Sequence, residues 1–149
     1  MSGKTCFFIG NRDTPNSIKE QLDEAIEKHI VEYDVTTFIV GHYGRFDVLV
    51  TDALCKAKKK HTNIELYLLE PYALNLTHKR ELPSEFNGSF YPEGLETVPK
   101  PFAIIKANRY VIQHSDYLIA YCHYIGNTKN FVKYAQRFEE KGLMKITLL

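Results

Sequence analysis

Residues 5–15, TCFFIGNRDTP, join an apolar run to a polar turn and a helix start. Residues 5–9 are almost continuously apolar, as in a strand buried on both faces, and Gly10 ends the run. Thr14 and Pro15 follow as a hydroxyl N-cap and a proline at the first helical position. Apolar side chains then recur at helical spacing: Ile18, Leu22, Ala25, Ile26, His29 and Ile30. A strand followed by a helix is therefore expected as the first unit of the fold.

The same alternation recurs along the rest of the chain. Further strands are expected at 36–40, 64–69, 117–122 and 145–149. Helical stripes are expected from Phe46 to Ala57, at Phe102, Ile105, Arg109 and Ile112, and over 130–141 before Gly142. Alternating strands and helices predict a three-layer, Rossmann-like α/β fold with helices on both faces of the sheet. We expect a mostly parallel five-stranded sheet in the order 3-2-1-4-5, with the flavodoxin-like order 2-1-3-4-5 as the alternative.

The length and composition favour one folded domain over residues 1–149. The chain has 149 residues, of which 44% are hydrophobic and 25% charged, which excludes a disordered or collagen-like protein. Five of the six prolines lie within residues 70–101. We expect this segment to be a long loop excursion, and such loops are often functional.

Charge, hydropathy and cysteine usage restrict the classes of function that we expect for this protein. The formal net charge is +1, so no global field attracts the protein to nucleic acid or to an acidic membrane. No apolar run approaches the roughly 20 residues of a membrane helix, and the N-terminus lacks a signal-peptide core. Three cysteines without CxxC spacing suggest reduced thiols. We expect a cytoplasmic protein without membrane contact.

Polar, glycine-containing turns follow three of the expected strands. They are Gly10–Thr14, Gly41–Asp47 and His123–Thr128. Because ligands of parallel sheets bind beyond the carboxyl ends of the strands, these turns are the candidate site. Glycine allows close approach of the backbone, a helix N-terminus attracts anions, and Arg12 carries a guanidinium suited to phosphate. No GxGxxG, P-loop or HExxH motif is present, so packing glycines and a surface arginine remain the simpler interpretation of any single turn.

Three stretches together resemble the SMF/DprA-LOG (SLOG) superfamily of Rossmann-like proteins. They are IGNRDTP at 9–15, VGHYGRFDVLV at 40–50 and NRYVIQHSDYLIAYCHYIGNTKNFVKYA at 108–135. The resemblance spans nearly the whole chain and lies closest to small stand-alone nucleotide-binding members. It implies that the protein binds a nucleotide or a nucleotide-derived small molecule, as a sensor or a sequestering module.

The resemblance also assigns roles to the turn residues. Gly10 and Arg12 would hold a phosphate, while Gly41, Gly44 and Asp47 would shape the sugar side. Gly126 and Thr128 would bind phosphate oxygens through a backbone N–H and a hydroxyl. The expected ligand site also includes the neighbouring turn residues Asn11, His42, Tyr43 and Asn127, together with Tyr91 of the 70–101 segment.

An enzymatic alternative follows from the LOG-type phosphoribohydrolases, which cleave the N-glycosidic bond of nucleoside monophosphates. Arg109 matches their arginine, but Asn130 or Phe131 stands where their glutamate is expected. Because glycosidic cleavage needs a nearby carboxylate, Glu93 or Glu96 would have to supply it. Tyr91 would then stack on the base. The acids of this loop have a simpler interpretation as solvated surface groups.

Other classes of function are weaker. Tyr110, Tyr117, Tyr121 and Tyr124 suggest single-stranded nucleic acid, but no basic stripe accompanies them in the sequence, so we do not favour it. The six histidines lack metal-ligand spacing, and no metal or cofactor is expected. Because members of the SLOG superfamily often dimerise through helices, the resemblance also implies a homodimer, for which Phe102, Ile105 and Tyr110 would supply the face.

Overall fold

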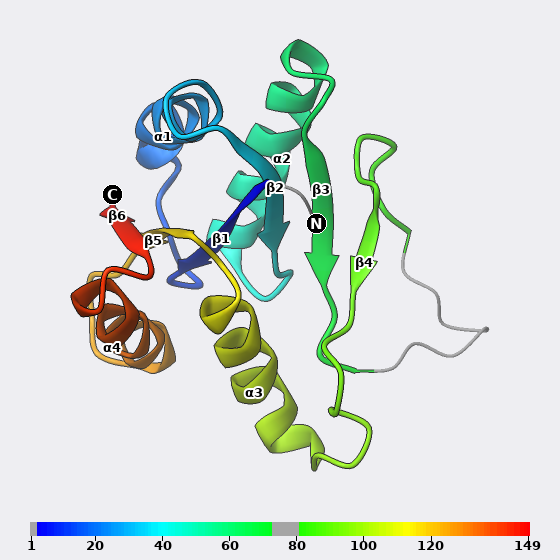
Figure 1. Cartoon of the computed structure of the whole chain (residues 1–149), viewed down its shortest axis with the longest axis vertical. Helices are drawn as coiled ribbons and strands as arrows, with labels where there is room; N and C mark the ends of the chain where they lie inside the picture. The colour runs from blue at the N-terminus through cyan, green and yellow to red at the C-terminus, as the bar shows by residue number, and fades with distance from the viewer. Residues whose placement is uncertain (1–2, 73–80) are drawn as a thin grey trace.

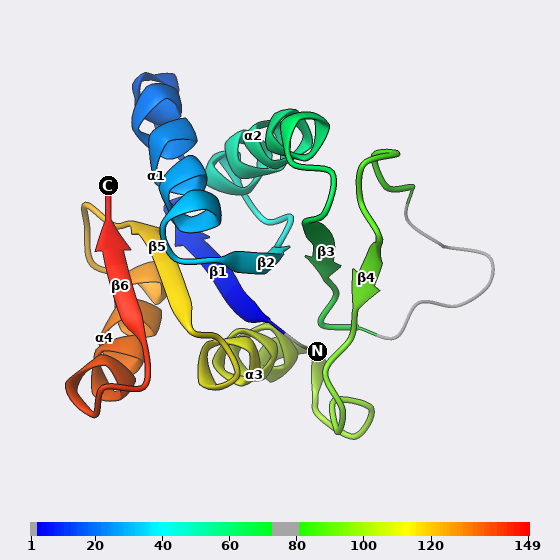
Figure 2. The ribbon, with the colours of Figure 1, turned by 45° about the horizontal axis from the view of Figure 1, so that its top comes forward.

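Six parallel strands form the central sheet of the computed structural model, which describes residues 3–72 and 81–149. The strand order is β4-β3-β2-β1-β5-β6, and every neighbouring pair is parallel (Figure 2). The strands are β1 Lys4–Gly10, β2 Val35–Val40, β3 Glu65–Leu69, β4 Gly88–Phe90, β5 Tyr117–Tyr121 and β6 Lys145–Leu148. The α/β prediction is confirmed.

The expectation of five strands, and with it the order 3-2-1-4-5, was wrong. A sixth strand, β4, lies at the sheet edge beside β3, within the segment that we expected to be a loop. Residues 73–80 of that segment lie outside the described residues. The side chain of Asn87 accepts a hydrogen bond from the Leu66 N–H at 2.9 Å, and the Asn87 N–H donates to the Leu66 carbonyl at 2.8 Å. Strand β4 therefore depends on this long-range contact and not on an apolar run of its own.

Helices cover both faces of the sheet. Helices α1 (Lys19–Val31) and α2 (Arg45–Lys60) lie on one face, and α3 (Lys100–Gln113) and α4 (Asn127–Glu140) lie on the other (Figures 1 and 2). Strand β1 is buried on both sides, since Cys6 and Phe8 join the core under α1 and α2 while Phe7 and Ile9 join the core under α3 and α4. Among the described residues, no helix combines the length and hydropathy needed to cross a bilayer.

The first helix begins later than the sequence suggests. Thr14 does not cap it, because the Thr14 hydroxyl donates to the Asn11 carbonyl at 2.6 Å. Pro15 instead precedes a short 3-10 turn, Asn16–Ile18, and α1 starts at Lys19. The threonine therefore closes the turn after β1.

Helix α3 is rotated relative to the expected stripe. Its buried residues are Ala103, Ala107, Val111 and Ile112. Phe102 is 57% exposed and Arg109 is exposed. The small alanines face the sheet. Of the expected stripe, Ile112 is buried and Ile105 packs against the same core, whereas Phe102 and Arg109 point away from it.

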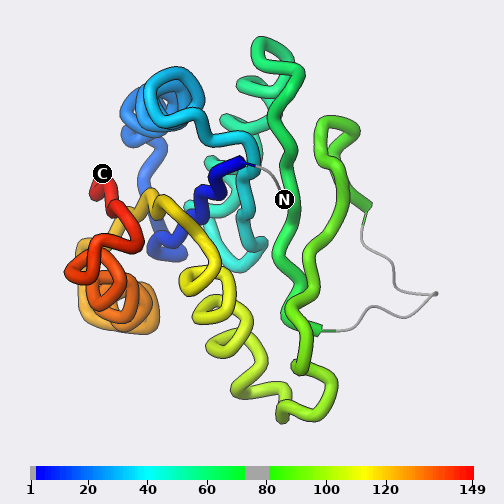
Figure 3. The backbone as a smooth tube through the Cα atoms, in the orientation of Figure 1, coloured from blue at the N-terminus to red at the C-terminus, as the bar shows by residue number. Residues whose placement is uncertain are grey.

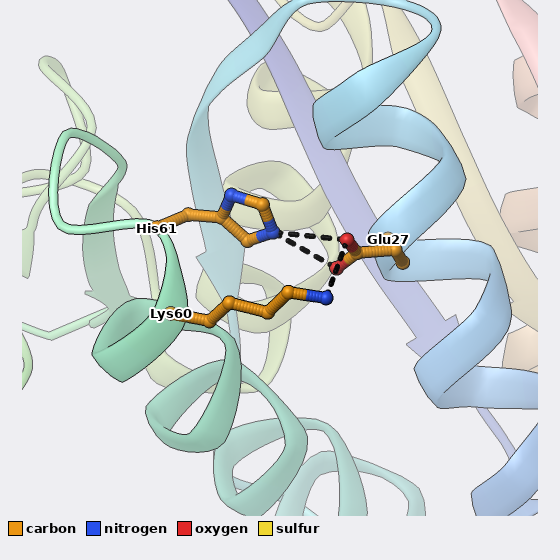
Figure 4. A network of polar contacts seen from close by, with 3 residues as sticks. All are labelled: Glu27, Lys60 and His61. Atoms are coloured by element: carbon orange, nitrogen blue, oxygen red, sulfur yellow. Dashed lines mark hydrogen bonds and ion pairs between the residues drawn. The ribbon is translucent and has the colours of Figure 1, made fainter.

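The C-terminus of α2 is tied to α1 by a polar network. The Glu27 carboxylate accepts hydrogen bonds from His61 at 2.9 Å and from Lys60 at 3.1 Å (Figure 4). The His61 and Lys60 bonds lower the pKa of Glu27. Because Lys60 is largely exposed and Glu27 is partly exposed, the Lys60–Glu27 pair adds little stability.

The direction in which successive strands are added to the sheet reverses once, at the central strand β1. From β1 the chain moves outward through β2 and β3 to β4, then returns through α3 to β5 on the other side of β1 (Figure 3). Turns after β1, β2 and β5 therefore meet at the same edge of the sheet, where ligands of such folds bind.

Candidate ligand site at the carboxyl ends of the strands

Hydrogen bonds join the turn after β1 to the turn after β5. The Asn11 side chain is buried and accepts from the His123 N–H at 2.9 Å, and the Asn11 N–H donates to the Tyr121 carbonyl at 3.1 Å. The Tyr124 hydroxyl donates to the Asp13 carboxylate at 2.7 Å. These contacts hold two segments more than a hundred residues apart in one arrangement.

The turn after β2 packs closely against the turn after β1. The Arg45 N–H, at the start of α2, donates to the Arg12 carbonyl at 2.7 Å. A Cβ atom added to Gly44 would lie 2.7 Å from the Arg12 Cα, so the approach of the two backbones requires glycine at this position.

Between the three turns lies a cavity of about 110 Å³, hereafter the strand-end cavity. Residues of the expected site line it: Gly10, Arg12, Gly41, Tyr43, Gly44, Asp47, Asn127 and Thr128. The structure thus brings together all three of the turns that the sequence singled out.

One side of the strand-end cavity is electropositive. Arg12 is exposed, and its guanidinium makes no ion pair with any of the described residues. Helix α4 begins after Gly126 without a side-chain cap and without an acidic residue in its first turn. Its N-terminal N–H groups and the Arg12 guanidinium therefore favour an anion at this end.

The Asp47 carboxyl lies on another side of the cavity. It accepts a hydrogen bond from the Tyr43 N–H at 2.9 Å. Burial raises the pKa of Asp47 to about 6, against the lowering effect of that hydrogen bond. Near pH 6 this group can therefore either accept a hydrogen bond from a ligand hydroxyl or donate one.

Other expected ligand residues lie outside the lining. Asn11 holds the turns together, and His42 pairs with the buried Glu70 at 2.6 Å beside the cavity. Gly126 is the residue before α4. Tyr91 packs against the core under α3 and α4, and burial together with the charge of Glu96 raises its pKa.

The residues of the enzymatic alternative are separated from the strand-end cavity. Arg109 and Glu93 line a different hollow, between α3, α4 and the loop before α3. Glu96 is exposed and lines neither space. Asp47 is the carboxyl group that the structure places in the strand-end cavity.

Sequence reasoning missed the contribution of α3 to the cavity. Ile104 and Asn108 line it, with the Asn108 amide donating to the Ile104 carbonyl at 2.7 Å, and Phe131 of α4 completes the apolar part. An asparagine inside a helix was a weak available signal, since this residue disfavours helix interiors.

A larger groove of about 780 Å³ lies between α1 and α2, far from the three turns. Its charged walls are already paired, Lys56 with Asp23 at 2.8 Å and Lys60 with Glu27 at 3.1 Å. This pairing makes the groove a weaker candidate for a charged ligand. Within 3–72 and 81–149, no cluster of three histidine, cysteine or acidic side chains is arranged to hold a metal ion.

No protein-family model matches the chain, and no curated protein matches it either.

Proposed function

We propose that the strand-end cavity binds the phosphate end of a nucleotide or a nucleotide-derived small molecule, and that the protein acts as a sensor or a sequestering module. The observation that carries the proposal is that the Arg12 guanidinium, which has no ion-pair partner among the described residues, and the N-terminus of α4, which has no side-chain cap, meet in one cavity.

The size of the cavity decides how much of the ligand it holds. Pockets that enclose a whole small molecule measure roughly 300–1,000 Å³. A cavity of about 110 Å³ suits a phosphate group, so the remainder of the ligand would lie across its mouth.

Two features support a nucleotide over inorganic phosphate. Tyr43 supplies an aromatic surface, and Asp47 supplies a carboxyl that suits a sugar hydroxyl. The resemblance of the three turns to the SLOG superfamily points to the same class of ligand.

A binding role is favoured over glycosidic cleavage. Arg109 and Glu93 line a separate hollow, so the residues that the enzymatic alternative needs do not meet the proposed phosphate. Release of free base from nucleoside monophosphates would instead support the enzyme.

Thermal unfolding in the presence of nucleotides tests the proposal. A ligand at 100 times its dissociation constant stabilises the folded state by about 2.7 kcal/mol, which raises Tm by several degrees. Nucleoside mono-, di- and triphosphates, cyclic nucleotides and inorganic phosphate should be compared. Arg12→Gln should abolish the shift.

Arg45→Gln is the matched control, because Arg45 is also exposed beside the turns but bonds to the Asn16 side chain. It should retain the ligand-induced shift. Absence of a shift with every phosphate compound, or equal loss in both variants, would count against the proposed site.

A further inference from the structure

Helices α3 and α4 carry an uneven share of the positive charge. Helix α3 contains Lys100, Lys106 and Arg109 and no acidic residue. The part of α4 from Asn127 to Arg137 contains three further cations and no acid. Since the chain as a whole has a formal charge of only +1, the two helices together hold an excess of positive charge, even with Glu139 and Glu140 at the end of α4 counted.

The hollow beside these helices, hereafter the α3–α4 hollow, measures about 360 Å³. Lys106, Arg109, Tyr110 and Gln113 of α3 line it, opposite Tyr134 of α4. The loop at Glu93–Leu95 closes a third side. This volume falls within the range of small-molecule pockets, roughly 300–1,000 Å³.

The α3–α4 hollow is distinct from the strand-end cavity. Ile104 and Asn108 line the cavity, whereas Lys106, Arg109 and Gln113 line the hollow. At 3.6 residues per turn these two sets occupy opposite sides of α3. A ligand in one space therefore does not contact the other.

The position of the Arg109 guanidinium suits the binding of an anion. Its guanidinium lies 5.0 Å from the centre of the Tyr134 ring, and that of Arg137 lies 5.8 Å from the same ring. The Tyr134 hydroxyl accepts a hydrogen bond from the Gln113 amide, which fixes the ring. A guanidinium stacked on a ring keeps its N–H edge available for a carboxylate or a phosphate.

Lys106 and Arg109 in the hollow, and Arg137 beside the Tyr134 ring, have no ion-pair partner among the residues that the structure describes. Glu93 is the one acidic residue among the lining residues, and it is exposed. An anion would relieve the repulsion among the three cations.

We infer that the α3–α4 hollow binds a small anion in which a planar ring is joined to a phosphate or a carboxylate. Lys106 and Arg109 hold the anionic group. Tyr110 and Leu95 supply the apolar wall for the ring. A second copy of the chain does not suit this face, because a two-fold contact would bring like charges together. The inference stands whether or not the strand-end cavity binds a nucleotide.

Backbone amide NMR titrations of the ¹⁵N-labelled full chain test the inference. The probes are phenyl phosphate, benzoate and inorganic phosphate. Phenyl phosphate or benzoate should shift the amides of residues 106–113 and of Tyr134 in a saturable way, with phosphate alone binding more weakly. Comparison of the first two probes shows which anionic group is preferred.

Two variants and one control complete the test. Arg109→Gln and Lys106→Gln should each weaken binding about tenfold, the value of one charge-assisted hydrogen bond. Lys141→Gln removes a cation at the end of α4, outside the hollow, and should leave binding unchanged.

Several outcomes would overturn the inference. Equal binding of phenyl phosphate and inorganic phosphate would indicate a counter-ion only. Shifts confined to residues 10–14 and 126–128 would place the probe in the strand-end cavity. Binding of a single-stranded oligonucleotide with steep salt dependence, without saturable binding of the small probes, would identify a nucleic-acid surface instead.

Discussion

The side-chain oxygen of Asn11 accepts a hydrogen bond from the backbone N–H of His123 at 2.9 Å. The two residues follow neighbouring parallel strands, β1 and β5, at the point where the chain changes its direction across the sheet. Asn11 is 2% exposed, so water does not compete for this bond. The contact holds the turn of Arg12 beside the turn that leads into α4.

Asn11→Ala should therefore destabilise the protein. The His123 N–H would lose its partner in a place that water reaches poorly, and the expected cost is about 1–3 kcal/mol. Urea denaturation monitored by circular dichroism measures this free energy of unfolding. The same variant should also lower the affinity of the strand-end cavity for its ligand, because the two turns lose their common alignment.

Asn16→Ala is the matched control for this substitution. The Asn16 side chain accepts from the exposed Arg45 guanidinium, so its removal should change stability by less than about 0.5 kcal/mol. Equal effects of the two variants would show that burial of the Asn11 bond is not what stabilises the turns.

Gly10→Ala is expected to be strongly destabilising. The added Cβ would lie 2.1 Å from Cγ of the Phe46 ring, so either the ring or strand β1 has to move. Overpacking of this kind costs about 1–3 kcal/mol or more. Thermal unfolding measures the loss of stability. A second substitution, Phe46→Leu, should reduce the destabilisation caused by Gly10→Ala, because it makes room beside the strand.

Gly88→Ala provides the contrast on the edge strand β4. The added Cβ would approach the Tyr67 ring only to 4.0 Å, which is an ordinary contact. The stability of this variant should therefore stay close to that of the unaltered protein. If Gly10→Ala were equally well tolerated, the close packing of Phe46 against the first turn would be refuted.

The strands that build the middle of the sheet could be predicted because each forms its own apolar run. Strand β1, for example, has five successive buried residues. Strand β4 could not be predicted, since Gly88–Phe90 contains one large apolar residue and pairs with β3 through Asn87. The missing information was a contact between distant segments, and the strand count was wrong for that reason.

The candidate site was predictable to a similar extent. Glycines and polar residues after β1, β2 and β5 were informative because the carboxyl ends of parallel strands meet at one edge. Asn108 was not, since its place in the cavity depends on the rotation of α3. That rotation follows from the burial of Ala103 and Ala107, which the apolar stripe through Phe102 did not indicate.

Asp47 should make stability depend on pH. Its pKa is raised from 3.8 to about 6 in the folded state, so between pH 4 and pH 6 the folded protein binds more protons than the unfolded chain. The free energy of unfolding contributed by this group therefore falls as the pH rises through this range. At about 1.4 kcal/mol per pKa unit, the full change is at most about 3 kcal/mol.

Asp47→Asn should remove this part of the pH dependence and make the protein more stable at pH 7 than the unaltered chain. The amide oxygen can still accept from the Tyr43 N–H, so the turn is preserved. Asp52→Asn, an exposed position on the same helix, is the control. Urea denaturation at pH 4, 5, 6 and 7 supplies the comparison, and identical pH profiles for Asp47→Asn and the unaltered protein would contradict the assignment.

The Thr128 hydroxyl is expected to support the cavity wall and not to hold the phosphate. It donates its one hydrogen to the Gly10 carbonyl at 3.3 Å, so it has none left for an anionic oxygen. The N–H groups at the start of α4 do not have this competing use. Thr128→Val should therefore cost about 0.5–1.5 kcal/mol of stability but weaken phosphate binding far less than Arg12→Gln.

Thr128→Ser keeps the hydroxyl and should match the unaltered protein in both stability and affinity. Calorimetric titration with the best phosphate compound from the thermal screen measures the affinities. Suppose that Thr128→Val folded normally and abolished binding, while Thr128→Ser bound fully. The hydroxyl would then have to release Gly10 and turn toward the ligand, which would make this residue part of the anion site. Retained binding in Thr128→Val instead assigns the anion to the helix N–H groups and Arg12, because these donors remain unchanged in that variant.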